Sequence, residues 1–292
     1  MRGLKPIQVP RCYNYIAVFL TLACNLRCSY CINNFAGPVA KKCHRHLNGK
    51  EWVEGLNRII SRPDLPVTLQ GGEPSLHKDF IYILNNIKSL LPVDILTNLQ
   101  FNVPDFIKKV NPERLKRESP YASIRVSYHP EQMKLAPLLK NVLRMQELGF
   151  SIGIWGVLHP SQKDTIRDVA RYCLEQGIDF RTKEFLGEHD GKLYGEYKYP
   201  GACDKKFRKK VLCKTTELII GPDGSVYRCT ADLYEGRPSV GHILDPDFQI
   251  KDKFRPCDWY GHCNPCDIKV KTNRLQQDGH TSVEILTEVQ VV

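Results

Sequence analysis

The chain has 292 residues, of which 42% are hydrophobic and 25% are charged, and its formal net charge is +10. This length allows one large domain or two modest ones, while the absence of any run of about 18 apolar residues argues against a membrane span. The N-terminal segment lacks the apolar core of a signal peptide, so we expect a cytoplasmic protein. The positive charge favours anionic partners, but the basic residues are dispersed, which does not favour a nucleic-acid interface.

Short β-rich runs alternate with amphipathic helical segments as far as about residue 186. The six runs are 15–22, 65–70, 92–97, 122–128, 151–158 and 178–186. Between them, Asn48 and Glu51 form a capping box for a helix whose apolar face extends from Trp52 to Ile60. Two more helices are predicted from Pro137 to Gly149 and from Ile166 to Gly177. This alternation predicts a parallel α/β fold, with right-handed crossovers that curl it into a partial (β/α)6 barrel. Its active site should lie at the C-terminal ends of the strands.

Three of the twelve cysteines, Cys24, Cys28 and Cys31, follow the first β run. In a reducing compartment, clustered cysteines indicate metal ligands before disulfides. Three thiolates can bind three irons of a [4Fe–4S] cluster and leave the fourth iron open. A zinc site is the alternative, with Cys43, His44 or His46 as its fourth ligand.

The CxxxCxxC spacing, with the aromatic Tyr30 before its last cysteine, resembles the signature of the radical S-adenosylmethionine (SAM) enzymes. The segment Gln70-Gly71-Gly72-Glu73-Pro74, which follows the second β run, resembles the GGE motif of that superfamily. The resemblance covers about residues 14–200. It implies that Cys24, Cys28 and Cys31 bind a [4Fe–4S] cluster, and that Gly71, Gly72, Glu73 and Pro74 hold the methionine end of SAM. By the same resemblance, Ser127, with His129 as second candidate, contacts the ribose; a strand-end serine that caps the next turn is the alternative.

The segment after residue 200 has a different pattern. Residues 217–229 predict a hairpin that turns at Pro222-Asp223-Gly224. Cys213, ten residues, Gly224, four residues and Cys229 resemble the opening of SPASM and Twitch extensions. The cysteines are too few for a full SPASM module, which favours a small α+β Twitch-like module with one auxiliary [4Fe–4S] cluster. A zinc ribbon is the alternative.

The expected ligands of this auxiliary cluster are Cys213, Cys229, Cys263 and Cys266, with Cys257 as an alternate. We therefore expect a barrel core over residues 1–200, the cluster module over 201–275, and a strand or tail over 276–292.

The resemblance implies an oxidoreductase or epimerase that receives electrons from a donor such as flavodoxin or ferredoxin. SAM would be cleaved to a 5′-deoxyadenosyl radical, which takes hydrogen from an unactivated C–H bond of the substrate. Oxidation and epimerisation both stay open, and Cys257 and Cys203 are candidate hydrogen donors for epimerisation.

The expected substrate is a small anionic, sugar, cyclitol or nucleotide-type molecule that can carry phosphate. Only 23 residues precede Cys24, which disfavours a leader-binding peptide maturase, the alternative within the superfamily. The chain also ends without the double glycine of the molybdopterin-pathway cyclase, which disfavours that activity. A non-catalytic zinc or iron–sulfur protein that binds nucleic acid is the alternative of another class.

Overall fold

The computed structural model describes residues 4–34, 45–271 and 280–286. Its main sheet has nine strands in the order β14-β13-β12-β2-β4-β5-β6-β7-β8. The six β runs predicted from the sequence are its parallel strands β2 (Tyr15–Thr21), β4 (Val67–Gly71), β5 (Val93–Thr97), β6 (Ile124–Tyr128), β7 (Ile152–Leu158) and β8 (Phe180–Glu184). They pair in chain order, as successive βαβ units require, and the predicted partial barrel is confirmed.

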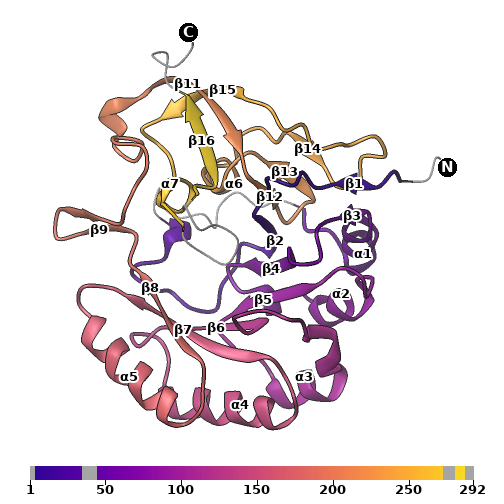
Figure 1. Ribbon diagram of the computed structural model, residues 1–292, viewed down its shortest axis with the longest axis vertical. Helices are drawn as coiled ribbons and strands as arrows, with labels where there is room; N and C mark the ends of the chain where they lie inside the picture. The colour runs from indigo at the N-terminus through magenta and orange to yellow at the C-terminus, as the bar shows by residue number, and fades with distance from the viewer. Residues whose placement is uncertain (1–3, 35–44, 272–279, 287–292) are drawn as a thin grey trace.

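Helices connect these strands and cover one side of the curved sheet (Figure 1). They are α1 (Gly49–Asn57), α2 (Phe80–Asn86), α3 (Val103–Lys109), α4 (Leu135–Glu147) and α5 (Lys163–Glu175), with short 3₁₀ turns η1 (Ile32–Asn34), η3 (Pro74–Leu76) and η4 (Pro112–Leu115). Among the described residues, none of the helices has the length and apolar character needed to cross a lipid bilayer.

Alternation along β6 separates an apolar face from a polar face. On β6, Ile124, Val126 and Tyr128 belong to the large core that packs under the helices. Arg125 and Ser127 lie on the opposite face, because successive side chains of a strand point to opposite sides of the sheet.

On β4, β5 and β8 the same alternation places Thr68, Asp94 and Lys183 on the inner face of the barrel. On β2 and β7 it places the apolar Phe19 and Trp155 there.

The predicted helix signals hold with one correction. Asn48 caps α1 and forms the expected capping box with Glu51, and Pro137 lies in the first turn of α4. However, the helix ends at Asn57, and Ile59–Ile60 form strand β3, which pairs in parallel with β1 (Ile7–Gln8). Ile59 therefore reaches the core from a strand, because hydrogen bonding to β1 replaces the last helical turn.

The C-terminal part joins the barrel more closely than the sequence predicted. The expected hairpin consists of β12 (Glu217–Ile220) and β13 (Ser225–Tyr227), but β12 also pairs in parallel with β2 and so extends the barrel sheet. A separate antiparallel sheet contains β11 (Lys209–Thr215), β15 (Arg255–Tyr260) and β16 (Val283–Leu286), at the top of Figure 1. Strand β16 lies in the segment expected to be a strand or a tail. The barrel sheet, through β12 and β13, contains strands from both sides of the expected boundary at residue 200.

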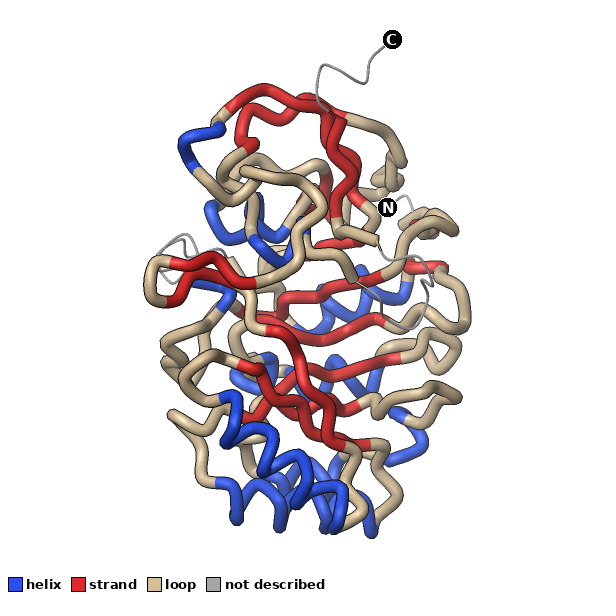
Figure 2. The backbone as a smooth tube through the Cα atoms, turned by 60° about the vertical axis from the view of Figure 1, so that its left-hand side comes forward, coloured by secondary structure: helices blue, strands red, loops and turns tan. Residues whose placement is uncertain are grey.

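Shorter elements complete the fold. They are the hairpin β9 (Gly187–His189) and β10 (Lys192–Tyr194), which projects from the side seen in Figure 2, the turn η5 (Lys205–Phe207), the helices α6 (Thr230–Glu235) and α7 (Pro265–Ile268), and strand β14 (Gly241–His242). The buried Asp267 accepts hydrogen bonds from Thr230 and from the Ala231 amide, which ties α7 to the start of α6.

Candidate active site

The three-cysteine loop rests directly on the two glycines after β4. The amide of Gly72 donates to the Thr21 carbonyl at 2.9 Å, and the amide of Glu73 donates to the Ala23 carbonyl at 2.8 Å. A Cβ atom added to Gly71 would overlap the Thr21 carbonyl oxygen, and one added to Gly72 would overlap that of Ala23. Only glycine permits this approach of two backbones, so the GG pair fixes where the cysteine loop lies.

Cys24, Cys28 and Cys31 lie close enough together on this loop to influence one another's pKa. Burial raises the pKa of Cys28 to about 12, and the nearby Cys31, Glu131 and Cys24 act in the same direction. Three thiolates this close repel one another unless a positively charged centre binds them, and that is the environment an iron cluster supplies. Cys24 Sγ also accepts a hydrogen bond from the Leu26 amide at 3.4 Å. The residues present therefore fit a cluster with three protein ligands.

The zinc alternative for this loop involves residues only partly described. Cys43 and His44 lie outside the described residues, and His46 packs edge-on against His77. In the described ranges, no three His, Cys, Asp or Glu side chains converge as the ligands of one metal ion would. Each thiolate of a [4Fe–4S] cluster binds a different iron, so its ligands do not share one point.

Glu73 is buried beneath the glycine pair and is held by the protein itself. Its carboxylate accepts hydrogen bonds from the Ser75 hydroxyl, the Thr97 hydroxyl and the Asn98 amide, each at 2.7 Å. Burial raises its pKa, while these donors oppose the shift. Pro74 is also buried, as the first residue of η3. Both residues brace the loop, and in this structure neither side chain is open to a bound molecule.

We expect Glu73→Ala to lower the free energy of unfolding by about 3 kcal/mol, because it leaves buried donors of β5 and η3 without an acceptor. Glu73→Gln should lower it by a smaller amount, because its carbonyl oxygen still accepts from Ser75 or Thr97. Urea unfolding of the cluster-free protein measures both changes. The control is Glu175→Ala at the exposed end of α5, which should change stability by less than about 0.5 kcal/mol. Equal changes in Glu73→Ala and the control would contradict the bracing role.

Aromatic and polar residues follow the ends of β6 and β7 beside Tyr30. The Tyr30 hydroxyl lies 3.1 Å from His129 Nδ1, and the Tyr30 ring stacks on His159 with 4.9 Å between centroids. Burial lowers the pKa of His129 to about 4, so this imidazole is neutral at ordinary pH. Ser127 lies nearby at the end of β6 on the inner face, where its side chain makes no hydrogen bond with any described residue.

Two residues of this site, Asn98 and His159, were missed by reasoning from the sequence, whereas His129 was the second candidate for the ribose contact; one signal is common to all three. Asn98, His129 and His159 each follow directly after a parallel strand. The carboxyl ends of parallel strands meet at one edge of the sheet, so a polar residue one step past each strand is a site candidate. Asn98 illustrates this, because its Nδ2 atom donates to Asn25 in the three-cysteine loop at 2.7 Å.

The inner face of the barrel carries three cations from distant segments. Arg125 lies next to Asp94 at 3.3 Å, and Lys271 lies next to Glu217 at 2.8 Å. The side chain of Lys183, in contrast, has no hydrogen bond or ion pair with any described residue. Its side chain is accessible to solvent, yet the surrounding protein lowers its pKa to about 8, and Arg125 and Lys271 act in the same direction. The neighbouring Glu184 instead pairs with Lys269.

Five cysteines of the C-terminal part share a second buried cluster, which we call the thiol cluster: Cys203, Cys213, Cys229, Cys257 and Cys263. Cys213 on β11 and Cys257 on β15 are diagonal neighbours on one face of their sheet. The Cys213 thiol donates a hydrogen bond that lowers the pKa of Cys257, and Arg228 also lowers it. Cys203 Sγ lies 3.3 Å from the Cys263 carbonyl oxygen. All eleven described cysteines are free thiols.

Cys266, an expected cluster ligand, lies apart from the thiol cluster. It is the second residue of α7, and the preceding Asn264 caps its amide and donates to the Ile32 carbonyl, next to the three-cysteine loop. Burial raises the pKa of Cys266, whereas Lys271 and Lys183 lower it, so its thiol lies near the inner-face cations. Cys257 and Cys203, the expected hydrogen donors, belong instead to the thiol cluster.

The other two described cysteines lie elsewhere in the fold. Cys173 lies in the core under α5, and Cys12 is exposed beside Asp252. Neither is near the three-cysteine loop or the thiol cluster.

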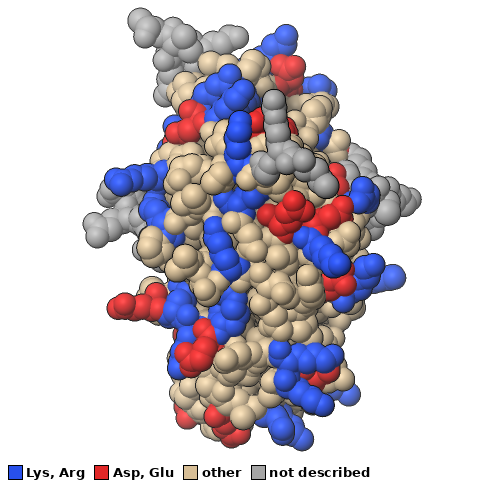
Figure 3. Space-filling model, turned by 90° about the vertical axis from the view of Figure 1, so that its right-hand side faces the viewer, with Lys and Arg blue, Asp and Glu red and all other residues tan. Residues whose placement is uncertain are grey.

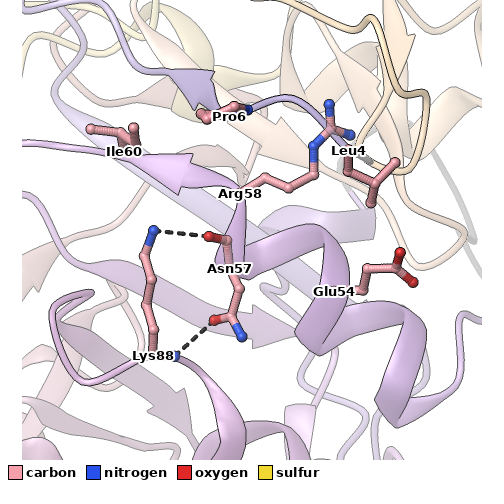
Figure 4. A pocket seen from close by; sticks show the side chains of 7 residues that line it. All are labelled: Leu4, Pro6, Glu54, Asn57, Arg58, Ile60 and Lys88. Carbon is pink, nitrogen blue, oxygen red and sulfur yellow. Dashed lines mark hydrogen bonds between the residues drawn. The ribbon is translucent and has the colours of Figure 1, made fainter. Parts of the chain in front are cut away.

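A pocket of about 400 Å³ lies away from these groups, beside α1 and β3 (Figure 4). Its two cations are used within the fold: Lys88 donates to the carbonyls of Asn57 and Ile59, and Arg58 donates to those of Lys5 and Asp245. The two cations of this pocket therefore stabilise the fold through backbone hydrogen bonds. On the face shown in Figure 3, basic and acidic side chains are interspersed, and that face presents no continuous basic track.

Comparisons with known proteins agree with this arrangement. The GTP 3',8-cyclase of Nautilia profundicola is 27% identical over 252 residues, which cover 80% of this chain and 73% of that protein. The GTP 3',8-cyclase of Aquifex aeolicus is 27% identical over 202 residues, and the match spans 62% of this chain and only 58% of the relative. A solved structure of anSMEcpe with bound AdoMet and the Kp18Cys peptide superimposes with a TM-score of 0.51 over 82% of this chain and 78% of that chain. Its sequence identity is 17%, so this likeness concerns the fold alone.

The sequence model of the radical SAM superfamily matches residues 18–173, slightly more than half of the chain. That range contains the three-cysteine loop, the glycine pair and the strands that position them. The chain therefore belongs to the radical SAM superfamily.

Proposed function

We propose that this radical SAM enzyme takes hydrogen from a C–H bond of a small, phosphate-bearing substrate bound against the inner face of the barrel. The observation that carries the proposal is Lys183, a cation without an ion-pair partner among the described residues, next to Arg125 and Lys271. Arg125 and Lys271 already pair with Asp94 and Glu217, which leaves the charge of Lys183 available to an added anion. A phosphate group supplies such an anion.

The names of the relatives support this class of substrate. Two proteins at 27% identity are named for a reaction of GTP, which is a nucleoside triphosphate. Identity at that level does not transfer GTP itself to this chain, and we propose a nucleotide or sugar phosphate. The sequence-based argument against the cyclase rested on the last residues, which lie outside the described ranges.

The residues of the three-cysteine loop and the glycine pair would hold the cluster and SAM. When bound, they supply a 5′-deoxyadenosyl radical from the one-electron reductive cleavage of SAM. Cys24, Cys28 and Cys31 would ligate three irons, while Asn98 and Glu73 keep the loop in place. The stacked rings of Tyr30 and His159 would lie beside the adenosine part of SAM. The barrel wall would exclude water from the site.

For the auxiliary [4Fe–4S] cluster we propose Cys213, Cys229, Cys257 and Cys263 as ligands. These four cysteines pack in one cluster, three of them buried and Cys263 partly buried, which supports this set over the one expected from spacing, which included Cys266. Arg228 lies near three of these sulfurs and would balance their negative charge, because Cys229, Cys257 and Cys213 all raise its pKa against the effect of burial.

The position of Cys266 favours return of hydrogen to the substrate radical, and so epimerisation over oxidation. In that step the S–H bond breaks homolytically, a C–H bond forms, and a Cys266 thiyl radical is left. One electron from a flavodoxin- or ferredoxin-type donor and one proton from solvent then restore the thiol. In D₂O, product formed this way carries one deuterium at the reacting carbon, whereas an oxidised product carries none there.

The test is anaerobic reconstitution followed by an assay of 5′-deoxyadenosine formation with dithionite. We expect about eight irons per chain, for two [4Fe–4S] clusters, and cleavage of SAM. Candidate nucleotide and sugar phosphates are then compared with their dephosphorylated counterparts as stimulants of cleavage. Equal stimulation by the two forms of each compound would overturn the proposed substrate class.

A further inference from the structure

Residues 205–210 form an exposed cationic segment outside the barrel. Five of its six residues are basic, and we call them the basic patch: Lys205, Lys206, Arg208, Lys209 and Lys210. All five are exposed, and none forms an ion pair with a described residue. Phe207, the one residue of the segment that is not basic, is 56% exposed. An exposed aromatic ring within unpaired cations is typical of a protein-binding surface.

The basic patch packs against residues 260–261, which lie between Cys257 and Cys263 of the thiol cluster. Lys209 on β11 pairs with Tyr260 on β15, and a Cβ atom on Gly261 would contact the backbone of residues 204–208. Cys203 lies two residues before the first lysine of the patch, and the Cys263 amide donates to the Ala202 carbonyl at 2.9 Å. A partner bound to the patch would therefore be separated from the thiol cluster by about one layer of residues.

Part of this surface is held rigid by stacked side chains. The Trp259 ring lies between two guanidinium groups, with the Arg208 carbon 4.3 Å and the Arg237 carbon 4.5 Å from its centroid. Arg237 is fixed in turn by Glu235 and Asp232. Arg208 is thus presented in one orientation, which lowers the entropy lost when an anionic partner binds.

We propose that the basic patch is the docking surface for an acidic one-electron carrier protein of the flavodoxin or ferredoxin type. This inference rests on the proposed function, because radical cleavage of SAM consumes one electron, which the reduced carrier would lose to the enzyme. Opposite charges on the two proteins steer their encounter and raise the association rate. The auxiliary iron–sulfur cluster proposed on the thiol cluster would supply a one-electron acceptor beneath the patch.

Nucleic acid is the competing occupant for such a patch. The patch is confined to six consecutive residues with one exposed aromatic ring, whereas binding of a strand uses a longer basic groove with several rings. The observations therefore favour a compact protein partner.

The experiment compares two triple variants that change charge equally. Lys205→Glu/Lys206→Glu/Lys210→Glu alters the patch, and Lys108→Glu/Lys140→Glu/Lys163→Glu alters exposed lysines on α3, α4 and α5. Cleavage of SAM is driven either by reduced flavodoxin or by dithionite, and binding of oxidised flavodoxin is measured directly at low ionic strength. We expect the patch variant to lose about tenfold or more in flavodoxin-driven rate and in flavodoxin affinity. Its dithionite-driven rate should stay unchanged, and the control variant should match the wild type.

Three results would overturn the proposal. The first is equal flavodoxin affinity in the patch and control variants, which can be measured even if the protein cleaves no SAM. The second is a flavodoxin-driven rate in the wild type that does not fall as salt is added. The third is a labelled oligonucleotide whose binding the patch variant loses while its flavodoxin affinity is kept. Failure of dithionite-driven cleavage in the wild type would instead refute the proposed function.

Discussion

Cys28→Ala should abolish the cleavage of SAM while leaving the rest of the protein folded. Alanine keeps the backbone of the loop, where the Cys28 carbonyl accepts a hydrogen bond from the Cys31 amide. It removes one of three thiolates, and two thiolates cannot hold a [4Fe–4S] cluster with an open iron. We expect reconstituted iron to fall from about eight to about four per chain and 5′-deoxyadenosine to fall below detection.

Two cysteine variants serve as controls for that result. Cys12→Ala removes an exposed thiol beside Asp252 and should change neither iron content nor cleavage. Cys213→Ala should also reduce iron to about four per chain, but SAM should still bind to the remaining cluster. Cleavage at the wild-type rate in Cys28→Ala would show that the three-cysteine loop is not the radical-generating centre.

Lys183→Met should raise the KM for a phosphate-bearing substrate by about tenfold to a hundredfold. A hydrogen bond to a charged group contributes about 1.5–3 kcal/mol, and each 1.4 kcal/mol corresponds to about a factor of ten. Methionine keeps the length of the side chain and removes its charge, while Lys183→Arg keeps the charge and should restore most of the affinity. Steady-state kinetics of 5′-deoxyadenosine formation at varied substrate concentration measure these effects.

The same lysine predicts a pH dependence with a definite sign. Because the protein lowers the pKa of Lys183 to about 8, its side chain is charged below that pH and neutral above it. Binding of an anion requires the charged form, so kcat/KM of the wild type should fall as pH rises through about 8. In Lys183→Met this fall should be absent, and in Lys163→Met, an exposed lysine on α5, it should persist. An unchanged pH profile in Lys183→Met would exclude the lysine from substrate binding.

Local sequence patterns were sufficient to predict which residues lie at the C-terminal ends of the barrel strands. Cys24, Cys28 and Cys31 lie on one loop, and the GGE segment lies on the next strand of the sheet, so short spacings and strand order bring them together. The alternation of β6, with apolar Val126 and polar Arg125, also predicts which face carries the site. The one error there, the helix that ends early at Asn57, arose because Ile59 and Ile60 fit both an apolar helix face and a buried strand.

Contacts between segments far apart in the sequence could not be predicted from the spacing of the cysteines or strands. The motif Cys263-x-x-Cys266 suggested a common ligand pair, but the α7 backbone turns Cys266 toward Lys271 while Cys263 joins Cys203. In the same way, nothing near residue 217 in the sequence indicates that β12 pairs with β2, some 200 positions earlier. Such contacts depend on how whole elements pack, which short-range patterns do not encode.

The sequence by itself therefore determined the class of chemistry, because a three-thiolate loop and a glycine pair are local features with a narrow range of uses. It also determined the parallel barrel, because βαβ periodicity repeats along the chain. Only the tertiary structure decided which thiols lie together in the C-terminal part, and that Lys183, Arg125 and Lys271 meet on the inner face. Those arrangements join residues up to 146 positions apart, and long-range packing, in which each contact depends on many others, sets them.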